Sequence, residues 1–467
     1  MVNRGRPSRY CLPCRRRKLQ CDLRPEGCGQ CRRARLMCQG YRDASDLLFR
    51  DETHSVQNKM IARQMARHHH PQPTSLELGL DARARHIFFS LYVFGFSRSL
   101  GAIAPLSRSA PVFGHLAATV DATSLAFLVT HLNNMELVRL ANQSYLMATR
   151  SLSGALAGLQ SGGAPEALQS ILLLDMYEKM INRNPQGSTS WMIHTQGGIS
   201  LVETFGSEIT LGVAGRDLCA RLVTAVVVSC GAAVVRVPDA LRTLRGRLNP
   251  FYNTVKWRFM GILISIVNLQ ADLHRAGGIS TMDMASRAQQ LDIQLARLQE
   301  TVPLPWRPRT ISPVRDHPLI FGTYYDVFAD HYVTQVTNGI RAMRLVLHQI
   351  LSRHSPGNVS SLKTRDITHQ ICASVPQFIL PWARSTQTVS FSPLQRLQCC
   401  TLLAPLYIAN QVSEDAYMRD WIRGCFEHMA DKGGMKMAQE MADLTKTNRG
   451  LDYWHVYAMV GSYAFAA

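Results

Sequence analysis

Acidic residues and long apolar runs are both scarce in this sequence. Its 467 residues include 51 lysines and arginines but only 33 aspartates and glutamates, which gives a formal net charge of +18. The start, M-V-N-R-G-R-P, lacks the apolar core of a signal peptide, and the most apolar stretch, 222–237, is too short to span a membrane. We therefore expect neither secretion nor membrane insertion, and thiols that stay reduced.

The common signatures of catalytic sites are also missing. The chain contains no H-E-x-x-H, no G-x-x-x-x-G-K-[ST], no G-x-G-x-x-G after a strand and no G-x-S-x-G. We therefore expect that the chain is not an enzyme. Dispersed catalytic residues leave no such signature, so an enzyme or scaffold that carries an accessory structural zinc module is the alternative.

Half of the cysteines lie in one short segment near the N-terminus. They follow the pattern C-x2-C-x6-C-x6-C-x2-C-x6-C between Cys11 and Cys38, and the segment is an internal duplication. C-L-P-C-R-R-R-K-L-Q-C aligns with C-G-Q-C-R-R-A-R-L-M-C, cysteine on cysteine and Leu19 on Leu36. A C-x2-C pair followed by a further cysteine is typical of zinc sites.

Two tetrahedral zinc ions require eight ligand positions, and six thiolates fill them if two thiolates bridge both ions. The duplication makes the first cysteine of each half the natural bridging ligand. A disulfide knot is disfavoured by the expected reducing environment, and a single-zinc ribbon would leave two cysteines idle. The predicted ligand sets are Cys11, Cys14, Cys21 and Cys28 for one ion and Cys11, Cys28, Cys31 and Cys38 for the other.

This segment resembles the zinc binuclear cluster, or Zn2Cys6, DNA-binding domain of fungal transcription regulators. The resemblance covers all six cysteines and implies two Zn2+ ions per chain and CGG-like triplets in double-stranded DNA. It also implies that Lys18 is the main base-reading residue, because a cation at the exposed end of a short helix over 15–19 can donate to guanine O6 and N7. The predicted DNA contacts are Lys18, Arg17, Arg15, Arg16 and Arg9.

Positive charge is concentrated around these cysteines. The first 42 residues contain twelve lysines and arginines but only Asp22 and Glu26 as acidic residues. Six thiolates with two Zn2+ ions would leave the segment strongly cationic, which is the electrostatic pattern of a nucleic-acid-binding surface. An ordinary solvated surface would carry more acidic partners.

The predicted domain order is a basic arm at 1–10, the Zn2Cys6 domain at 11–42, a linker at 43–75 and an all-α regulatory domain at 76–467. The linker contains at most two approximate heptads, fewer than a coiled coil needs, so both a monomer and a homodimer stay open. The resemblance further implies a nuclear location, the transcription machinery as a partner, and regulation of RNA polymerase II transcription. For short members of this subclass it implies secondary-metabolite gene clusters as targets.

Beyond residue 76, apolar residues recur at helical spacing and alternating strand patterns are scarce. The six remaining cysteines lie in apolar surroundings and are predicted to be buried small hydrophobes. His194 and Gly197-Gly198 are expected to serve helix packing. Helices are predicted over 82–100, 124–159, 165–181, 191–205, 222–237, 255–274, 282–301, 323–351, 361–380, 394–412 and 415–430, with a proline-rich loop at 303–318.

Overall fold

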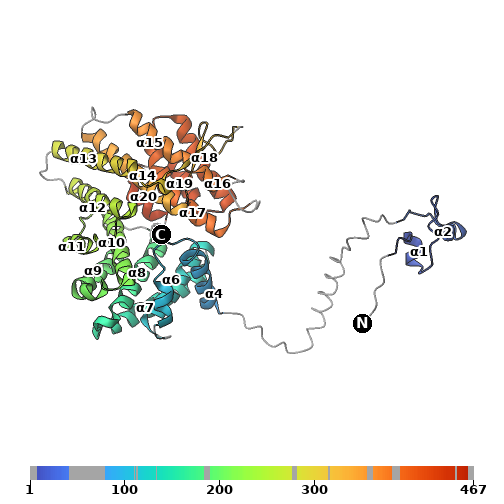
Figure 1. Ribbon diagram of the computed structural model, residues 1–467, viewed down its shortest axis with the longest axis horizontal. Coiled ribbons are helices and arrows are strands. Elements are labelled where there is room, and N and C mark those ends of the chain that lie inside the picture. Colours follow the sequence, from blue (N-terminus) through green and yellow to red (C-terminus); the bar gives the residue numbers. More distant parts are fainter. Residues whose placement is uncertain are drawn as a thin grey trace. The chain divides into compact units, whose positions relative to one another are not determined.

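The chain divides into two compact units, Met1–Glu77 and Leu78–Ala467. The linker predicted at 43–75 and the first seven residues of the basic arm lie outside the described residues. The computed structural model (Figure 1) describes residues 8–41, 79–109, 111, 114–132, 134–183, 190–275, 281–313, 316–354, 361–380, 390–447 and 450–460.

Residues 8–41 of the N-terminal unit contain two short helices, and the larger unit is helical almost throughout its described residues. In the first half of the larger unit, α6 packs against α7 and α8, and α9 packs against α8 and α10. The elements of the two short helices and this half are α1 (Leu12–Arg16), α2 (Gly29–Arg33), α4 (Leu80–Ile87), the π-helical η3 (Phe88–Val93), α5 (Ile103–Ser109), α6 (His115–Leu132), α7 (Met135–Ala157), η4 (Ser161–Gly163), α8 (Ala164–Ile181), α9 (Ser190–Ile209), α10 (Val213–Ala233) and α11 (Asp239–Leu248).

The second half of the larger unit is joined to the first through α12, which packs against α10 on one side and against α13 and α14 on the other. Figure 1 shows these later helices, in yellow to red, beside the blue-to-green ones. Its elements are α12 (Val255–His274), α13 (Thr281–Glu300), η5 (Leu304–Trp306), β1 (Arg309–Ile311), β2 (Tyr325–Val327), α14 (His331–His354), α15 (Ser361–Ala373), α16 (Pro376–Ile379), α17 (Pro393–Val412), α18 (Ala416–Gly433), α19 (Lys436–Thr447) and α20 (Tyr453–Met459).

The predicted all-α architecture is confirmed, but one long helix was predicted where the structure has two. The stretch 124–159 is divided between α6 and α7. Asn134 begins the second helix in an extended conformation, and its side-chain oxygen accepts a hydrogen bond from the Glu136 amide at 2.8 Å. Asparagine is a favoured N-cap because it satisfies an amide that the helix leaves unpaired. Apolar periodicity continues across this break and therefore concealed it.

The helix predicted over 323–351 begins too early. α14 starts at His331, and the preceding residues form β2, which pairs antiparallel with β1 in a two-stranded sheet. Asp330 accepts a hydrogen bond from the Val333 amide at 2.9 Å and so caps the helix where it does begin. The pairing depends on a partner strand fourteen residues earlier, which helical periodicity does not reveal.

The packing roles predicted for the 191–205 stretch are confirmed in part. A Cβ atom on Gly198 would lie 2.6 Å from Leu222 Cδ1, so this glycine permits the close approach of α9 to α10. A Cβ atom on Gly197 would meet nothing within 4 Å, so Gly197 has no such role. His194 is half-buried and bonds the Tyr145 hydroxyl at 2.8 Å. All six cysteines of the larger unit are buried, as predicted.

Candidate metal centre and nucleic-acid interface

The two halves of the cysteine segment adopt the same local structure. α1 and α2 each contain five residues and each follow a cysteine, Cys11 or Cys28, that occupies the N-cap position in an extended conformation. The second cysteine of each C-x2-C pair lies in the helix itself and is buried. Helices of this length are not stable alone in water, so something other than helix propensity must hold them.

The first helix differs from the predicted range of 15–19, because it begins at Leu12 and ends at Arg16. Lys18 has φ of 53°, in the left-handed region. The Leu19 amide bonds the Cys14 carbonyl at 2.9 Å and the Lys18 amide bonds the Arg15 carbonyl at 3.3 Å. This pair of bonds is the Schellman motif, which terminates a helix at a left-handed residue. Lys18 therefore lies just beyond the helix.

The second helix ends in the same way. Arg35, which aligns with Lys18 in the duplication, has φ of 54°. The Leu36 amide bonds the Cys31 carbonyl at 2.9 Å. Glycine is the usual residue at such a position, and another residue costs about 1–2 kcal/mol there. Each half therefore holds a cation in a strained conformation, and strain of this kind is concentrated at functional sites.

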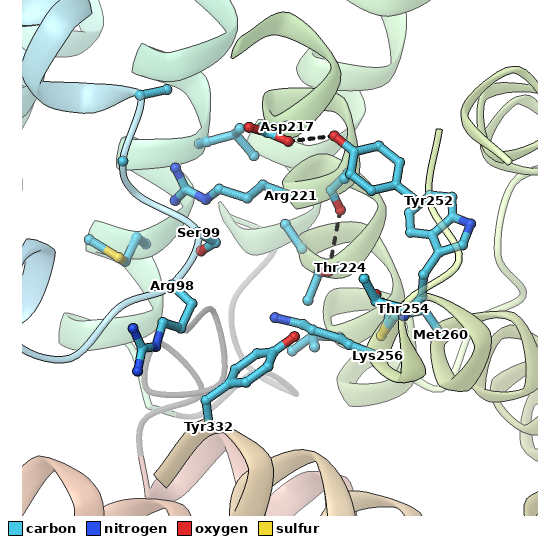
Figure 2. A pocket seen from close by; sticks show the side chains of 18 of the residues that line it. Arg98, Ser99, Asp217, Arg221, Thr224, Tyr252, Thr254, Lys256, Met260 and Tyr332 are labelled. Carbon is cyan, nitrogen blue, oxygen red and sulfur yellow. Dashed lines mark hydrogen bonds between the residues drawn. The ribbon is translucent and has the colours of Figure 1, made fainter. Parts of the chain in front are cut away.

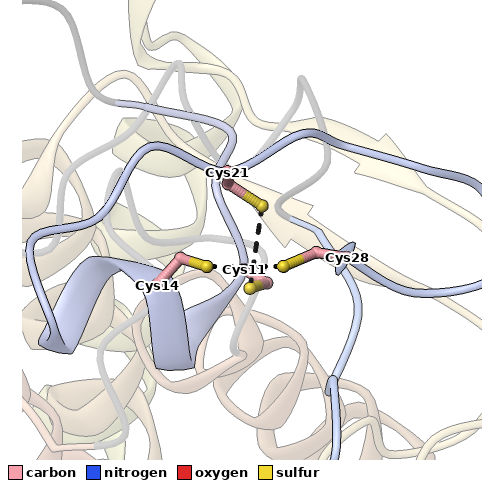
Figure 3. Close-up of side chains that lie close together, drawn as sticks. All are labelled: Cys11, Cys14, Cys21 and Cys28. Carbon is pink, nitrogen blue, oxygen red and sulfur yellow. Dashed lines mark hydrogen bonds between the residues drawn. The ribbon is translucent and has the colours of Figure 1, made fainter. Parts of the chain in front are cut away.

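Four of the six thiols form one tight group, shown in Figure 3. The sulfur atoms of Cys11, Cys14, Cys21 and Cys28 all lie within 4.8 Å of one another. The Cys14 and Cys28 sulfurs are 3.4 Å apart, and the Cys21 and Cys11 sulfurs are 3.7 Å apart. These four are the set predicted for the first zinc ion.

The second group contains Cys11, Cys31 and Cys38, whose sulfur atoms also lie within 4.8 Å of one another. The Cys11 and Cys31 sulfurs are 3.6 Å apart. Cys11 thus belongs to both groups, as a bridging ligand would. The Cys28 amide bonds the Cys38 sulfur at 3.4 Å, but the Cys28 thiol is outside this second group, so its bridging role stays a prediction.

The donor set fits zinc in geometry and in chemistry. Sulfur atoms bound to a tetrahedral Zn2+ at about 2.3 Å lie about 3.8 Å apart, and the three shortest separations here are 3.4, 3.6 and 3.7 Å. All six thiols are free. Burial raises the pKa of Cys14, and raises the pKa of Cys31 to about 12, so these thiols need a cation beside them to ionise at neutral pH. Zinc supplies that charge and, with it, folding energy.

An acidic side chain distinguishes the second half from the first. The Gly29 amide, in the first turn of α2, donates to both carboxylate oxygens of Asp22 at 3.0 Å. A Cβ atom on Gly29 would lie 2.5 Å from Asp22 Oδ2, so a larger residue would displace this contact. Asp22 also pairs with Arg24 at 3.4 Å. This role of Asp22 was not predicted from the sequence, although a carboxylate is favourable at a helix N-terminus.

The predicted DNA-contacting side chains form an exposed cationic surface. Arg9, Arg16, Arg17 and Lys18 are exposed, while Arg15 is half-buried with its Nε atom enclosed. Within residues 8–41, the ion pair between Arg24 and Asp22 is the only one, so none of these five cations is neutralised by a neighbour. Surface cations without acidic partners are suited to phosphate oxygens and base edges.

Outside the cysteine segment, the part of the chain that the structure describes holds no comparable metal site. Among the described residues, no group of three or more cysteine, histidine, aspartate or glutamate side chains gathers outside the cysteine segment. No helix of the described part has the length and apolar character that crossing a membrane requires.

Comparison with known proteins identifies the cysteine segment. Residues 9–47 match the sequence model of the fungal Zn(2)-Cys(6) binuclear cluster domain. No curated protein and no solved structure matches the chain. The match suggests a DNA-binding transcription factor of the fungal type. With its clustered thiols and its pseudo-symmetric helices, the N-terminal unit is a fungal Zn2Cys6 binuclear cluster domain that binds two zinc ions.

Proposed function

We propose that this protein regulates RNA polymerase II transcription in the nucleus by binding CGG-type triplets through its zinc cluster. Lys18 is the residue that reads the bases, and Arg17 lies beside it at the base edges. Arg9, Arg15 and Arg16 contact the phosphate backbone. On the family resemblance, the regulated genes belong to a secondary-metabolite cluster.

The conformation of Lys18 is the observation that carries this proposal. It is an exposed cation held at a left-handed position directly after α1, where glycine would cost less. The Schellman bonds fix its backbone relative to the buried Cys14. A lysine in that place can present its ammonium group to guanine O6 and N7 without first ordering a loop.

The neighbouring arginines explain why binding would be tight as well as selective. Arg16 and Arg17 are exposed and adjacent to Lys18, and neither has an acidic partner among residues 8–41. Phosphate contacts contribute most of the sequence-independent affinity and make it dependent on salt. Base contacts then select the site.

Replacement of Lys18 by alanine tests the assignment, with Arg35→Ala as a matched control. Both residues are exposed cations at equivalent left-handed positions, so the two changes should affect folding alike. The zinc-loaded full chain is used to select sequences from a random DNA duplex library. We expect wild type and Arg35→Ala to enrich CGG, and Lys18→Ala to lose about 1–3 kcal/mol of discrimination at the triplet.

Zinc content, measured on each variant, should stay at two ions per chain, because neither residue is a thiol ligand. If Lys18→Ala keeps its preference for CGG, or if Arg35→Ala loses it to the same extent, Lys18 is not the reading residue. A chelated sample of the wild type serves as the zinc-free reference and should enrich nothing.

A further inference from the structure

The helical body contains a cavity of about 580 Å3 between α8, α10, the start of α12 and the loop that precedes α5 (Figure 2). Its volume lies in the range of small-molecule binding sites. Arg98 and Asp217 line it and are exposed, so the cavity communicates with solvent at that edge. In Figure 2, Tyr332, at the beginning of α14, lies on the same side as Arg98 and away from Asp217.

Most of the wall is apolar or aromatic. Leu172 and Met176 come from α8, Val228 from α10 and Met260 from α12. The Trp257 ring belongs to the same wall and is buried. A surface of this kind is suited to the apolar body of a ligand, while a few polar groups fix its orientation.

Cations outnumber carboxylates among the lining residues, and two of the cations form ion pairs with carboxylates. Arg98 pairs with Asp330 at 2.7 Å. Lys179 is buried and pairs with Asp175 at 2.6 Å. The other two cations of the wall are Arg221 and Lys256, and Asp217 lies at the rim.

Arg221 is enclosed in this wall and feels the charge of Asp175, but it forms no ion pair among the described residues. It is only 8% exposed, its Nη1 atom is buried without a hydrogen-bond partner, and no carboxylate of the described residues forms an ion pair with it. Burial lowers its pKa to about 10, so it stays charged at neutral pH. A buried guanidinium without a partner destabilises a protein, so its presence in a cavity wall requires an explanation.

Lys256 is a second cation of the cavity wall. Lys256 lies over the Tyr332 ring at 5.5 Å. Burial, followed by the nearby charge of Arg221, lowers its pKa to about 8. α12 begins at Val255, so the positive end of its dipole is part of the same wall. An anion placed between these groups would relieve the repulsion between them.

We propose that this cavity binds a small organic acid, whose anionic group pairs with Arg221 and whose apolar or aromatic body lies against Met176, Trp257 and Met260. Arg221 anchors the acid through charge-assisted hydrogen bonds, which are stronger than neutral ones. Lys256 adds a second positive charge on the opposite side. The helical domain is thereby a ligand-binding domain, an inference that does not depend on how the zinc cluster reads DNA.

Titration calorimetry on the zinc-loaded full chain, without DNA, tests this with a charged probe and its neutral counterpart. The probes are 1-naphthylacetate and 1-naphthylacetamide, which share an apolar body and differ in charge. We expect the acid to bind saturably and more tightly than the amide. Arg221→Met, which retains an apolar stem and removes the guanidinium group, should weaken binding of the acid by about 10- to 100-fold and leave that of the amide little changed.

Arg139→Met is the control, because Arg139 is an exposed residue of α7 paired with Glu136 outside the cavity. It should bind the acid as wild type does. Thermal unfolding without probe should show that Arg221→Met is at least as stable as wild type, since an unpaired buried charge has been removed. If Arg221→Met does not fold, Lys256→Met should likewise weaken only the acid.

Three outcomes would overturn the proposal. They are equal affinity of the wild type for acid and amide, unchanged acid affinity in both cavity variants, and no saturable binding of either probe at millimolar concentration. Each can be obtained whether or not the chain binds CGG, so failure of this site and failure of the DNA-binding proposal are distinguishable.

Discussion

The interiors of the two units are filled by different chemistry. In the N-terminal unit the buried cluster consists of five cysteines, with Tyr10, Cys38 and Tyr41 packed at its edge. In the helical body one continuous apolar core extends from α4 to α20. A segment of about thirty residues cannot bury enough apolar surface to fold alone, so a metal takes the place of the core. A larger unit can depend on hydrophobic burial.

Removal of zinc is the largest perturbation that separates the two units. We expect a strong chelator to unfold residues 11–38 completely, because structural zinc supplies about 10 kcal/mol or more of the folding free energy of such modules. The body should stay folded, since none of its described residues forms a metal site. Hydrogen exchange measured by mass spectrometry should show full exchange in the cysteine segment and unchanged protection in α6, α10 and α14.

Addition of zinc in excess should restore protection in the cysteine segment. Loss of protection in the body at the same chelator concentration would mean that the two units do not fold independently and that apolar burial alone does not hold the body.

Two glycine substitutions sharpen the comparison within the apolar core. A Cβ atom on Gly231 would lie 2.6 Å from Trp454 Cε2, so Gly231→Ala forces α10 away from α20 and should destabilise the body by about 1–3 kcal/mol. Gly197, exposed in the middle of α9, meets nothing. Gly197→Ala should therefore stabilise the body by about 0.5–1 kcal/mol, because alanine has the higher helix propensity.

Urea denaturation followed by far-ultraviolet circular dichroism measures both changes, and zinc content should be the same in both variants. The two changes are expected to have opposite signs because Gly231 contacts Trp454, whereas Gly197 has no neighbour within 4 Å. If both substitutions stabilise the body, Trp454 does not lie as close to Gly231 as the structure places it.

A small effect, similar in size to that of Gly197→Ala, is expected for the backbone of the zinc unit. Lys18→Gly should stabilise the zinc-loaded unit by about 1 kcal/mol, because glycine adopts the left-handed conformation at little cost. Lys18→Ala should bring no such gain. Competition for zinc against a chelator of known affinity detects the difference, with Arg35→Gly expected to behave as Lys18→Gly does.

A gain in zinc affinity together with a loss of DNA selectivity in Lys18→Gly would show that stability is given up at this position for recognition. If Lys18→Gly binds zinc no better than Lys18→Ala, the left-handed conformation of residue 18 costs no free energy and Lys18 is not strained.

How much could be predicted differs between local and distant features. The gathering of the thiols follows from cysteine spacing within a few residues, whereas the helix predicted over 15–19 begins three residues later than α1 does. The end of α1 was misplaced because glycine, the usual marker of a left-handed helix end, is replaced by Lys18. The signal was present in the repeat itself, where a cation followed by leucine recurs at Arg35 and Leu36.

In the body, apolar periodicity identified most helices but neither the cap at Asn134 nor the strand Tyr325–Val327. Both depend on contacts that a periodic pattern leaves unspecified, one with a backbone amide and one with a distant strand. Arg221 is a further case, since one arginine among many in the sequence shows no sign of lying buried and unpaired.

The sequence by itself therefore determined the metal, its number of ions and the cationic character of the surrounding surface, because thiolate ligands separated by short spacers can meet only locally. It also determined that the described part of the larger unit is almost entirely helical. Only the tertiary structure decided which cations are exposed for DNA and which one is enclosed. Burial is set by the packing of α8, α10 and α12 against one another, and segments far apart in the chain must meet before a cavity or an unpaired charge exists.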